Sequence, residues 1–312
     1  MNQKLKKILV ALDGSELAEE ALDPAVALAA QDGAELHLIS VIWQVPPVSM
    51  ALASETVISG WIGEEKAKAQ EYLDRTADKA RARSPNVSVS THVRRGEVSS
   101  TVRAVAEELN VDLVVLTTHG RGALKRSALG STADRLLRSV ERPLLLLRHP
   151  QTNVWAFDPE TLRHVLVPLD GSDAAESALD ALLMVLPEGG GPRVTLARVI
   201  DEKYHIPMIY IAEAVSEEGL REKHRQHAET YLEQASSQLK SKGIANVEGQ
   251  VIVDDDPGRG LIRLCNEVGV ELIVISTHGR GGVPRFFLGS VAADLIRGAP
   301  VPVLVTRRPE PA

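Results

Sequence analysis

The strongest constraint on this chain is an internal repeat the size of a domain. Residues 9–23 (LVALDGSELAEEALD) and 166–180 (LVPLDGSDAAESALD) are identical at 11 of 15 positions. Residues 115–138 and 274–297 are identical at 13 of 24 positions. Solenoid repeats have periods of about 20–50 residues, whereas these blocks recur after 157 and 159 residues. Each copy is therefore expected to fold as a domain with its own core.

The repeat divides the 312 residues into two domains of similar length. We predict a first domain at residues 1–149, a linker at residues 150–162 and a second domain at residues 163–312. The linker is polar and contains prolines, which suits a connection between compact domains. Hydrophobic residues make up 44% of the chain, enough for a core in each domain.

Within each copy, short apolar runs alternate with segments of helical periodicity. The predicted strands are residues 7–12, 34–42, 87–93, 111–117 and 143–147, and in the second copy 164–169, 193–200, 247–253, 270–276 and 301–306. The predicted helices of the first copy are residues 16–30, 64–83, 98–109 and 132–140. This alternation predicts an α/β fold in which each half is a five-stranded parallel, doubly wound, Rossmann-like domain.

A doubly wound sheet binds ligands at the carboxyl ends of its strands, where the winding direction switches. The two most similar blocks of the repeat lie at two such ends. Asp13-Gly14-Ser15 follows the first strand, and a glycine-rich segment follows the fourth strand. We therefore expect a ligand site at this edge of each domain.

The glycine-rich segment has the composition of a phosphate site. It reads Thr118-His119-Gly120-Arg121-Gly122 and then Gly130-Ser131-Thr132, with Thr277-His278-Gly279-Arg280-Gly281 and Gly289-Ser290-Val291 in the second copy. Glycines let backbone N–H groups approach an anion, a helix start adds free N–H groups, and the arginines would supply a fixed charge. The alternative is a loop whose glycines only permit tight turns. The segment is neither a Walker A loop nor a dinucleotide fingerprint.

These motifs resemble those of universal stress proteins, and nearly all of both halves is similar to a tandem pair of UspA-like domains. The nucleotide-binding branch of that family carries Gly, two residues, Gly, nine residues and then Gly-Ser or Gly-Thr. Gly120 with Gly130-Ser131 matches the second part of this motif, as does Gly279 with Gly289-Ser290. Thr117 and Ser276 stand in place of the first glycine, so the signature is incomplete in both copies.

The resemblance implies the adenine nucleotide alpha hydrolase-like variant of the fold and a role for residues near the first two strands. Asp13 and Asp170 would hydrogen-bond the nucleoside. Adenine would lie beside Ala11 and Leu12, or Pro168 and Leu169, and the backbone of Val41 or Val199 would read its edge. The expected ligand is ATP or another adenine nucleotide, with Mg²⁺ held through its phosphates. The alternative for Asp13 is to cap the following helix, aided by Ser15.

Little in the sequence supports fast catalysis, which needs an activated nucleophile or a tuned acid–base pair. His119 and His278 either polarise a phosphate or cap their own loops. Cys265 falls in a helical pattern and is expected to be a buried hydrophobic residue. His224 and His227 lie on a charged helix with no third ligand evident, so we expect no protein-held metal ion.

We therefore expect an ATP-binding stress or signalling module with one nucleotide site per domain and slow or no hydrolysis. One alternative is a slow ATPase or self-phosphorylating enzyme that uses the same residues. Another is an interaction scaffold that acts without nucleotide, in which Thr117 and Ser276 would mark lost sites.

Charge and hydropathy limit the partners. The net charge is −7, all of it in residues 151–312, which argues against a nucleic-acid partner. No membrane span or targeting segment is evident, and we expect a cytoplasmic protein. The resemblance implies that the last strands of the two domains pair as an internal pseudo-dimer, with a homodimer also possible. Apolar residues after the second strands would cover the nucleotide, form a partner surface, or pack on their own helix: Trp43, Pro46, Pro47, Met50 and Trp61, and Tyr204, Ile206, Pro207, Met208, Ile209 and Tyr210.

Overall fold

The fold consists of two compact units, one formed by Gln3–Pro159 and the other mainly by Glu160–Ala312. The structure is a computed structural model. It describes residues 4–42, 54–118, 129–148, 157–159, 161–187, 191–200, 217–277 and 288–307. The two units are described separately below.

The first unit contains a five-stranded sheet in the order β3-β2-β1-β4-β5. Its strands are β1 (Lys7–Ala11), β2 (Glu35–Ile42), β3 (Val89–Arg95), β4 (Leu113–Thr117) and β5 (Leu144–Leu147). All four neighbouring pairs are parallel. From the centre of the sheet, successive strands are added outward as β1, β2 and β3 on one side and as β4 and β5 on the other. The winding direction therefore switches between β1 and β4, which confirms the predicted doubly wound architecture.

The second unit repeats this arrangement with the strand order β10-β9-β6-β7-β8. Its strands are β6 (His164–Pro168), β7 (Arg193–Ile200), β8 (Val247–Val253), β9 (Leu272–Ser276) and β10 (Val303–Thr306). All of its pairs are parallel as well. The switch in winding lies between β6 and β9, the counterparts of β1 and β4.

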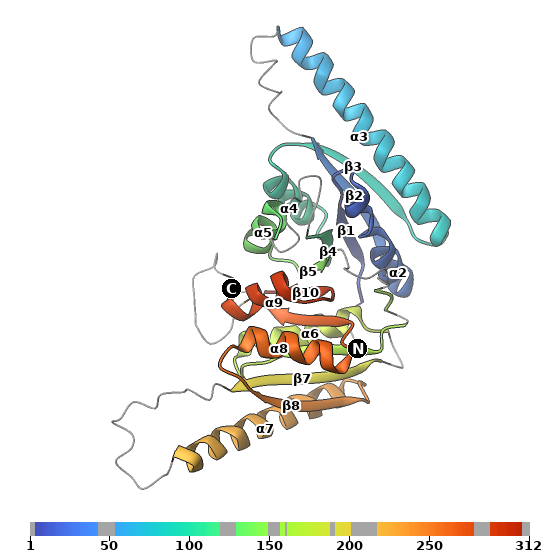
Figure 1. The fold of residues 1–312 in the computed structure, drawn as a ribbon. Coiled ribbons are helices and arrows are strands. Elements are labelled where there is room, and N and C mark those ends of the chain that lie inside the picture. The colour runs from blue at the N-terminus through green and yellow to red at the C-terminus, as the bar shows by residue number, and fades with distance from the viewer. Residues whose placement is uncertain are drawn as a thin grey trace. The chain divides into compact units, whose positions relative to one another are not determined.

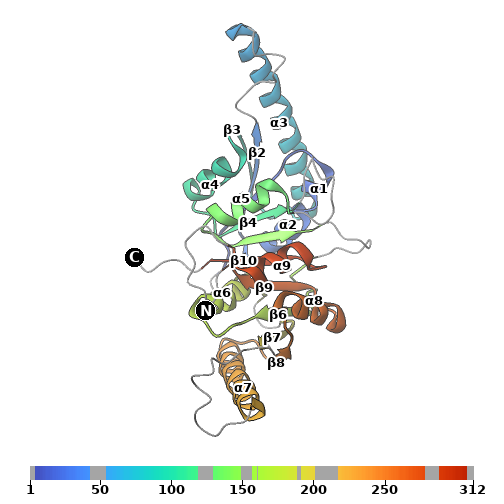
Figure 2. The same cartoon turned by 60° about the vertical axis from the view of Figure 1, so that its left-hand side comes forward.

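Helices cover both faces of each sheet. In the first unit they are α1 (Glu16–Glu19), α2 (Leu22–Asp32), α3 (Glu55–Arg83), α4 (Val98–Glu108) and α5 (Ser131–Ser139). The long helix α3 packs on β2 and β3 next to α2, while α4 and α5 lie side by side (Figures 1 and 2). The second unit has α6 (Asp173–Val185), α7 (Glu217–Ser241), α8 (Pro257–Val268) and α9 (Ser290–Gly298). There α7 packs on β7 and β8, and α8 contacts α9 (Figure 2).

The central strands form the core of each unit. Ile8, Leu9 and Val10 of β1 are fully buried, as are Val114 and Val115 of β4. A parallel strand covered by helices on both faces has no solvent side, so its central positions are apolar. This explains why the sequence shows unbroken apolar runs at these strands rather than an alternating pattern.

The predicted helix at residues 16–30 is two helices, α1 and α2, with a break at Glu20 and Ala21. Pro24 stands in the first turn of α2, where backbone N–H groups have no partner within the helix, so proline is tolerated there. The counterpart of Pro24 in the second copy is Ala181, and α6 runs there without a break. A proline in only one copy accounts for the difference.

The long helix α3 begins at Glu55, nine residues before the predicted start. Trp61, expected in an apolar loop, therefore lies within α3 and is partly exposed. The other residues of the two expected apolar loops lie outside the described residues. Glycine and β-branched residues in the first turns of α3 had concealed the helical pattern.

Candidate functional site

Parallel pairing brings the two repeated motifs to one edge of each sheet. Val10 of β1 is the register partner of Val115 of β4, so Ala11 and Thr117 end neighbouring strands at the same edge. In the second unit Leu166 is paired with Ile273. Pro168 and Ser276 then occupy the corresponding strand ends. The candidate site in each unit is this carboxyl edge at the switch in winding.

The loop after β1 is held by its aspartate. Oδ1 of Asp13 accepts hydrogen bonds from the backbone N–H and the hydroxyl of Ser15, at 3.0 and 2.6 Å. The Ser15 hydroxyl then accepts the N–H of Ala18 at 3.2 Å, which makes Ser15 the N-cap of α1. Asp13 thus orients the capping serine rather than capping the helix itself. Gly14 has a φ of 82°, a left-handed conformation that glycine adopts without strain.

The second copy reproduces this loop. Oδ1 of Asp170 accepts from the N–H and hydroxyl of Ser172, at 2.9 and 2.7 Å. Ser172 caps α6 by accepting the N–H of Ala175 at 3.1 Å. Gly171 has a φ of 86°. Both aspartates are therefore fixed in the same way beside the start of a helix.

The end of the second strand lies beside this loop in both copies. The N–H of Leu12 donates to the carbonyl of Ile39 at 2.9 Å, and the N–H of Leu169 donates to the carbonyl of Ala197 at 2.8 Å. Val41 and Val199 lie two residues further along these strands and are half-buried. Leu12 and Leu169 are buried, so the edge combines an apolar floor with backbone polar groups.

The fourth strand and the following helix meet at a single point. The N–H of Gly130 donates to the carbonyl of Thr118 at 2.8 Å, and the N–H of Gly289 donates to the carbonyl of Thr277 at 2.9 Å. A Cβ atom on Gly289 would lie 3.2 Å from that carbonyl oxygen of Thr277, so a side chain would crowd the close approach. In each copy this hydrogen bond joins the end of the fourth strand to the start of the following helix.

The helix starts at this point are able to receive an anion. Gly130 and Gly289 are the N-cap residues of α5 and α9, and neither has a side chain to cap the first N–H groups. Ser131 and Ser290 follow and are exposed, while Thr132 and Val291 are half-buried. Free N–H groups at the positive end of a helix dipole bind phosphate well.

Half of the expected phosphate loop lies outside the described residues. This applies to His119, Gly120, Arg121 and Gly122, and to His278, Gly279, Arg280 and Gly281. Thr117 and Ser276, which replace the first glycine of the motif, end β4 and β9. The described part of the site is thus the aspartate loop, the second-strand end and the helix start.

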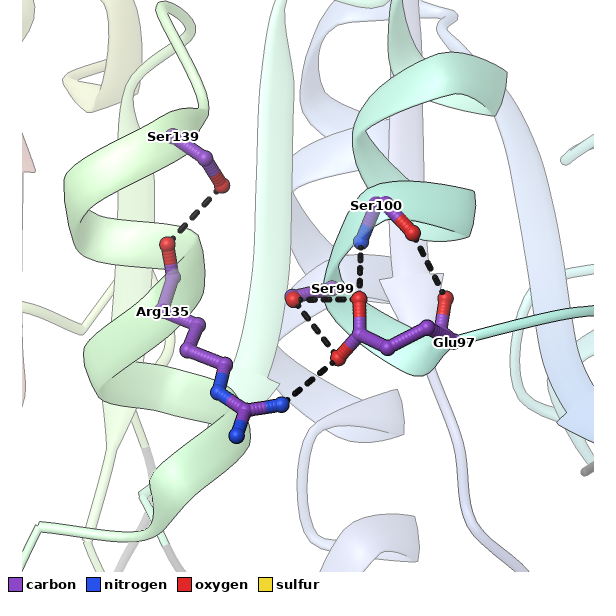
Figure 3. A network of polar contacts seen from close by, with 5 residues as sticks. All are labelled: Glu97, Ser99, Ser100, Arg135 and Ser139. Carbon is purple, nitrogen blue, oxygen red and sulfur yellow. Dashed lines mark hydrogen bonds and ion pairs between the residues drawn. The ribbon is translucent and has the colours of Figure 1, made fainter.

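A polar network in the first unit joins α4 to α5, and the sequence did not indicate it (Figure 3). The carboxylate of Glu97, the N-cap of α4, accepts the N–H of Ser100 at 2.8 Å and the hydroxyl of Ser99 at 2.7 Å. It also accepts a hydrogen bond from Arg135 of α5 at 2.9 Å. Arg135 lies about one turn after Ser131, so this ion pair orients the helix that begins at the candidate site.

The network depends on a charged Glu97. The Ser100 N–H is the main cause that lowers the pKa of Glu97 to about 2, and the Ser99 hydroxyl adds to the effect. In the second unit Asp256 caps α8 by accepting the N–H of Arg259 at 2.9 Å. Asp294 stands there at the position of Arg135, so the second copy lacks this pairing of opposite charges.

A tyrosine on the long helix of each unit was also missed. Tyr72 of α3 and Tyr231 of α7 are 159 residues apart, and each is followed by a buried leucine. The Tyr231 hydroxyl donates to Glu176 at 3.3 Å, and the Arg198 guanidinium lies 5.2 Å from its ring centre. The Tyr72 hydroxyl is buried and has no hydrogen-bond partner among the described residues. The Tyr-Leu pair recurs after 159 residues, the same spacing as the glycine-rich block, and this recurrence in the sequence is the signal that identifies the tyrosine.

The remaining chemically active residues do not gather at this edge. Cys265 is buried in α8, and burial raises the pKa of its thiol to about 12, so it is not a nucleophile at neutral pH. His224 and His227 are exposed on α7. Within the described ranges, no group of three or more His, Cys, Asp or Glu side chains is placed to hold a metal ion. No described helix is long and apolar enough to cross a membrane.

Comparison with known proteins agrees with this organisation. A sequence model of the Universal stress protein family matches residues 4–148 and again residues 161–307. Universal stress protein MJ0531 of Methanocaldococcus jannaschii is 32% identical over 147 residues, 47% of this chain and 84% of that protein. Universal stress protein Rv2319c of Mycobacterium tuberculosis is 28% identical over 314 residues, 96% of this chain and 98% of that protein.

Structural comparison gives the same fold. The crystal structure of a universal stress protein from Archaeoglobus fulgidus matches with a TM-score of 0.71 at 21% identity, covering 97% of this chain and 98% of that one. Fold and repeat together define a tandem α/β protein with two copies of one doubly wound domain. The chain belongs to the universal stress protein family, and the matches to the family model fall once in each half.

Proposed function

We propose that this chain is an ATP-binding universal stress protein with one nucleotide site per domain. It would act as a stress-response or signalling module, with slow or no hydrolysis of the bound nucleotide. The observation that carries the proposal is the repeated meeting of an aspartate loop and an uncapped helix start at the switch in winding of each sheet. A single strand edge of this kind is common in α/β folds. The same geometry at the equivalent edge of both domains supports a ligand site in each domain.

The geometry supports a definite orientation of the nucleotide. Asp13 or Asp170 accepts hydrogen bonds from the ribose, and the base lies over Ala11 and Leu12 or Pro168 and Leu169, with its edge at the backbone of Val41 or Val199. The phosphates lie at the helix starts, and Mg²⁺ is held through the phosphates. The phosphate-binding residues are Thr117, His119, Gly120, Arg121, Gly122, Gly130, Ser131 and Thr132, and Ser276, His278, Gly279, Arg280, Gly281, Gly289, Ser290 and Val291.

Two further proposals concern assembly, which the family resemblance supports, and location. The last strands, β5 and β10, would pair the two domains, and two such chains could also form a homodimer. Slow hydrogen exchange of the amides of both strands in monomeric protein would support the internal pairing, and fast exchange would contradict it. We also propose that the protein acts in the cytoplasm, which cell fractionation tests.

The proposed sites are tested by removing their aspartates in the full-length chain. We expect Asp13→Ala and Asp170→Ala each to leave one tight ATP site per chain in calorimetry, and the double variant to leave no tight site. A hydrogen bond to a charged group contributes about 1.5–3 kcal/mol, so affinity at each altered site should fall roughly 10- to 150-fold. Asp78→Ala, at an exposed residue of α3, removes the same charge and should leave both sites unchanged.

If the double variant is folded by circular dichroism and binds ATP as the wild type does, the aspartates do not form the sites. Measurable phosphate release by the wild type that both substitutions abolish would favour the slow-ATPase alternative.

A further inference from the structure

A buried arginine lies beside the candidate site of the second unit. Arg198 of β7 is only 7% exposed, and it immediately precedes Val199. The residue before it, Ala197, accepts the N–H of Leu169 at 2.8 Å, next to the Asp170 loop. An arginine is seldom buried to this extent without a specific role, because removing its charge from water is costly.

The arginine belongs to a chain of contacts that leads back to the aspartate loop. Its guanidinium lies 5.2 Å from the centre of the Tyr231 ring, within range of a cation–π interaction. The Tyr231 hydroxyl donates to Glu176 at 3.3 Å, and Glu176 is in the first turn of the helix that follows Asp170. Burial, Glu176 and Asp170 raise the pKa of Tyr231, whereas Arg198 lowers it. All three charges therefore act on one half-buried tyrosine.

The first unit has no such cation at the same place. Its Ser40 occupies the register position of Arg198, one residue after Ile39, whose carbonyl accepts the N–H of Leu12. The counterpart of Glu176 is Glu19, which pairs instead with the half-exposed Lys79 at 2.6 Å. The two candidate sites thus share the aspartate and the tyrosine and differ in a buried positive charge.

We propose that Arg198, held on Tyr231, is a specificity-determining residue that makes the second site prefer the more highly charged adenine nucleotides. The inference rests on the proposed function and extends it. Arg198 offsets the charges of Asp170 and Glu176, which would otherwise repel the phosphates. Charges spread over the surface are screened within about 8 Å at physiological ionic strength, whereas a buried charge is screened much less. The second site therefore binds ATP more tightly than the first, although its half carries the whole net charge of −7.

The test uses full-length chains with one site silenced. The Asp13→Ala chain retains the second site, and the Asp170→Ala chain retains the first. Each variant chain is titrated with Mg-ATP and with adenosine. We expect the second site to show the larger ratio of ATP to adenosine affinity. Adding Arg198→Met to the Asp13→Ala chain should lower ATP affinity about tenfold and adenosine affinity less than twofold, since Coulomb energy scales with ligand charge.

The matched control is Arg225→Met, which removes a positive charge from the exposed face of α7. It should leave both affinities of the second site within about twofold. If ATP and adenosine affinities fall equally in Arg198→Met, or neither falls, Arg198 does not act through charge and the inference is wrong. If neither silenced chain binds ATP while both remain folded, the proposed function fails instead.

A second variant covers the case in which Arg198→Met does not fold. Tyr231→Leu removes the ring that holds the guanidinium and leaves the charge in the chain. Tyr231→Leu should lower the ratio of ATP affinity to adenosine affinity at the second site. Arg198→Lys keeps the positive charge, so its affinity ratio should be much closer to the wild-type value than that of Arg198→Met. An unchanged ratio in a folded Tyr231→Leu chain would overturn the proposal.

Discussion

Tyr72 and Tyr231 occupy equivalent positions on α3 and α7, yet their hydroxyl groups have different surroundings. The Tyr231 hydroxyl is bonded to Glu176, whereas the buried Tyr72 hydroxyl has no bonding partner in the described part of the chain. Burial and the nearby Glu19 carboxylate raise the pKa of Tyr72 to about 12, so the group is a neutral donor at pH 7. A buried donor without a partner is costly, because it has given up its hydrogen bonds to water.

This difference predicts opposite effects of one substitution in the two copies. Tyr231→Phe should lower the free energy of unfolding by about 0.5–1.5 kcal/mol, because it removes a hydrogen bond. Tyr72→Phe should leave the free energy unchanged or raise it by up to about 1 kcal/mol, because it removes an unsatisfied group. Urea unfolding of the nucleotide-free chain measures both. Equal losses in the two variants would show that Tyr72 does have a partner.

At the scale of secondary-structure elements, the contact between α4 and α5 sets the direction of the helix start in the first site. Glu97 caps α4 and pairs with Arg135, and the same two positions in the second unit are Asp256 and Asp294. In the first unit, α4 and α5 are therefore joined by opposite charges. In the second unit, α8 approaches α9 closely at Gly258, where an added Cβ atom would lie 2.7 Å from the Cβ atom of Asp294. We expect the pH response of the first domain to reflect the hydrogen bonds that the Glu97 carboxylate accepts as the N-cap of α4.

Glu97→Gln should lower the free energy of unfolding at pH 7 by about 0.5–2 kcal/mol, the usual value of an N-cap. Because the pKa of Glu97 falls from 4.5 to about 2 on folding, its contribution is fully present above pH 4.5. It is lost as the pH falls toward 2. Thermal unfolding between pH 7 and pH 2.5 checks this. The wild type and variant should converge at low pH, whereas Glu107→Gln, at an exposed i,i+4 pair, should follow the wild type throughout. A constant difference across the range would contradict the assignment.

The elements also show what the sequence could predict. The strands were predicted well because central parallel strands are unbroken apolar runs, and the repeat supplied each pattern twice. The break between α1 and α2 was missed because the spacing of apolar residues continues across Glu20 and Ala21, although Pro24 was a visible signal. The start of α3 was missed because its first turns are mostly exposed and carry poor helix formers.

The site was predictable only where its residues lie next to one another in sequence. Asp13 and Ser15, or Gly130 and Ser131, form motifs that a reader can recognise. The contacts of Glu97 with Arg135 and of Arg198 with Tyr231 join residues more than 30 positions apart, and their geometry depends on how helices pack on the sheet. No local pattern encodes such contacts, so only the structure identifies them.

At the scale of the whole molecule, the chain is one domain present twice with unequal electrostatics. Residues 1–150 carry no net charge and residues 151–312 carry −7. The match to Rv2319c covers 96% of this chain, so the similarity extends over both copies of the domain. Two domains with the same edge geometry predict two nucleotide sites in each chain.

The most direct measurement is the stoichiometry of Mg-ATP binding to the full-length wild-type chain by isothermal titration calorimetry. We predict two sites per chain, with the tighter one lost in Asp170→Ala. Binding of a single ATP, or none, by folded nucleotide-free protein would contradict the claim that each domain retains a site.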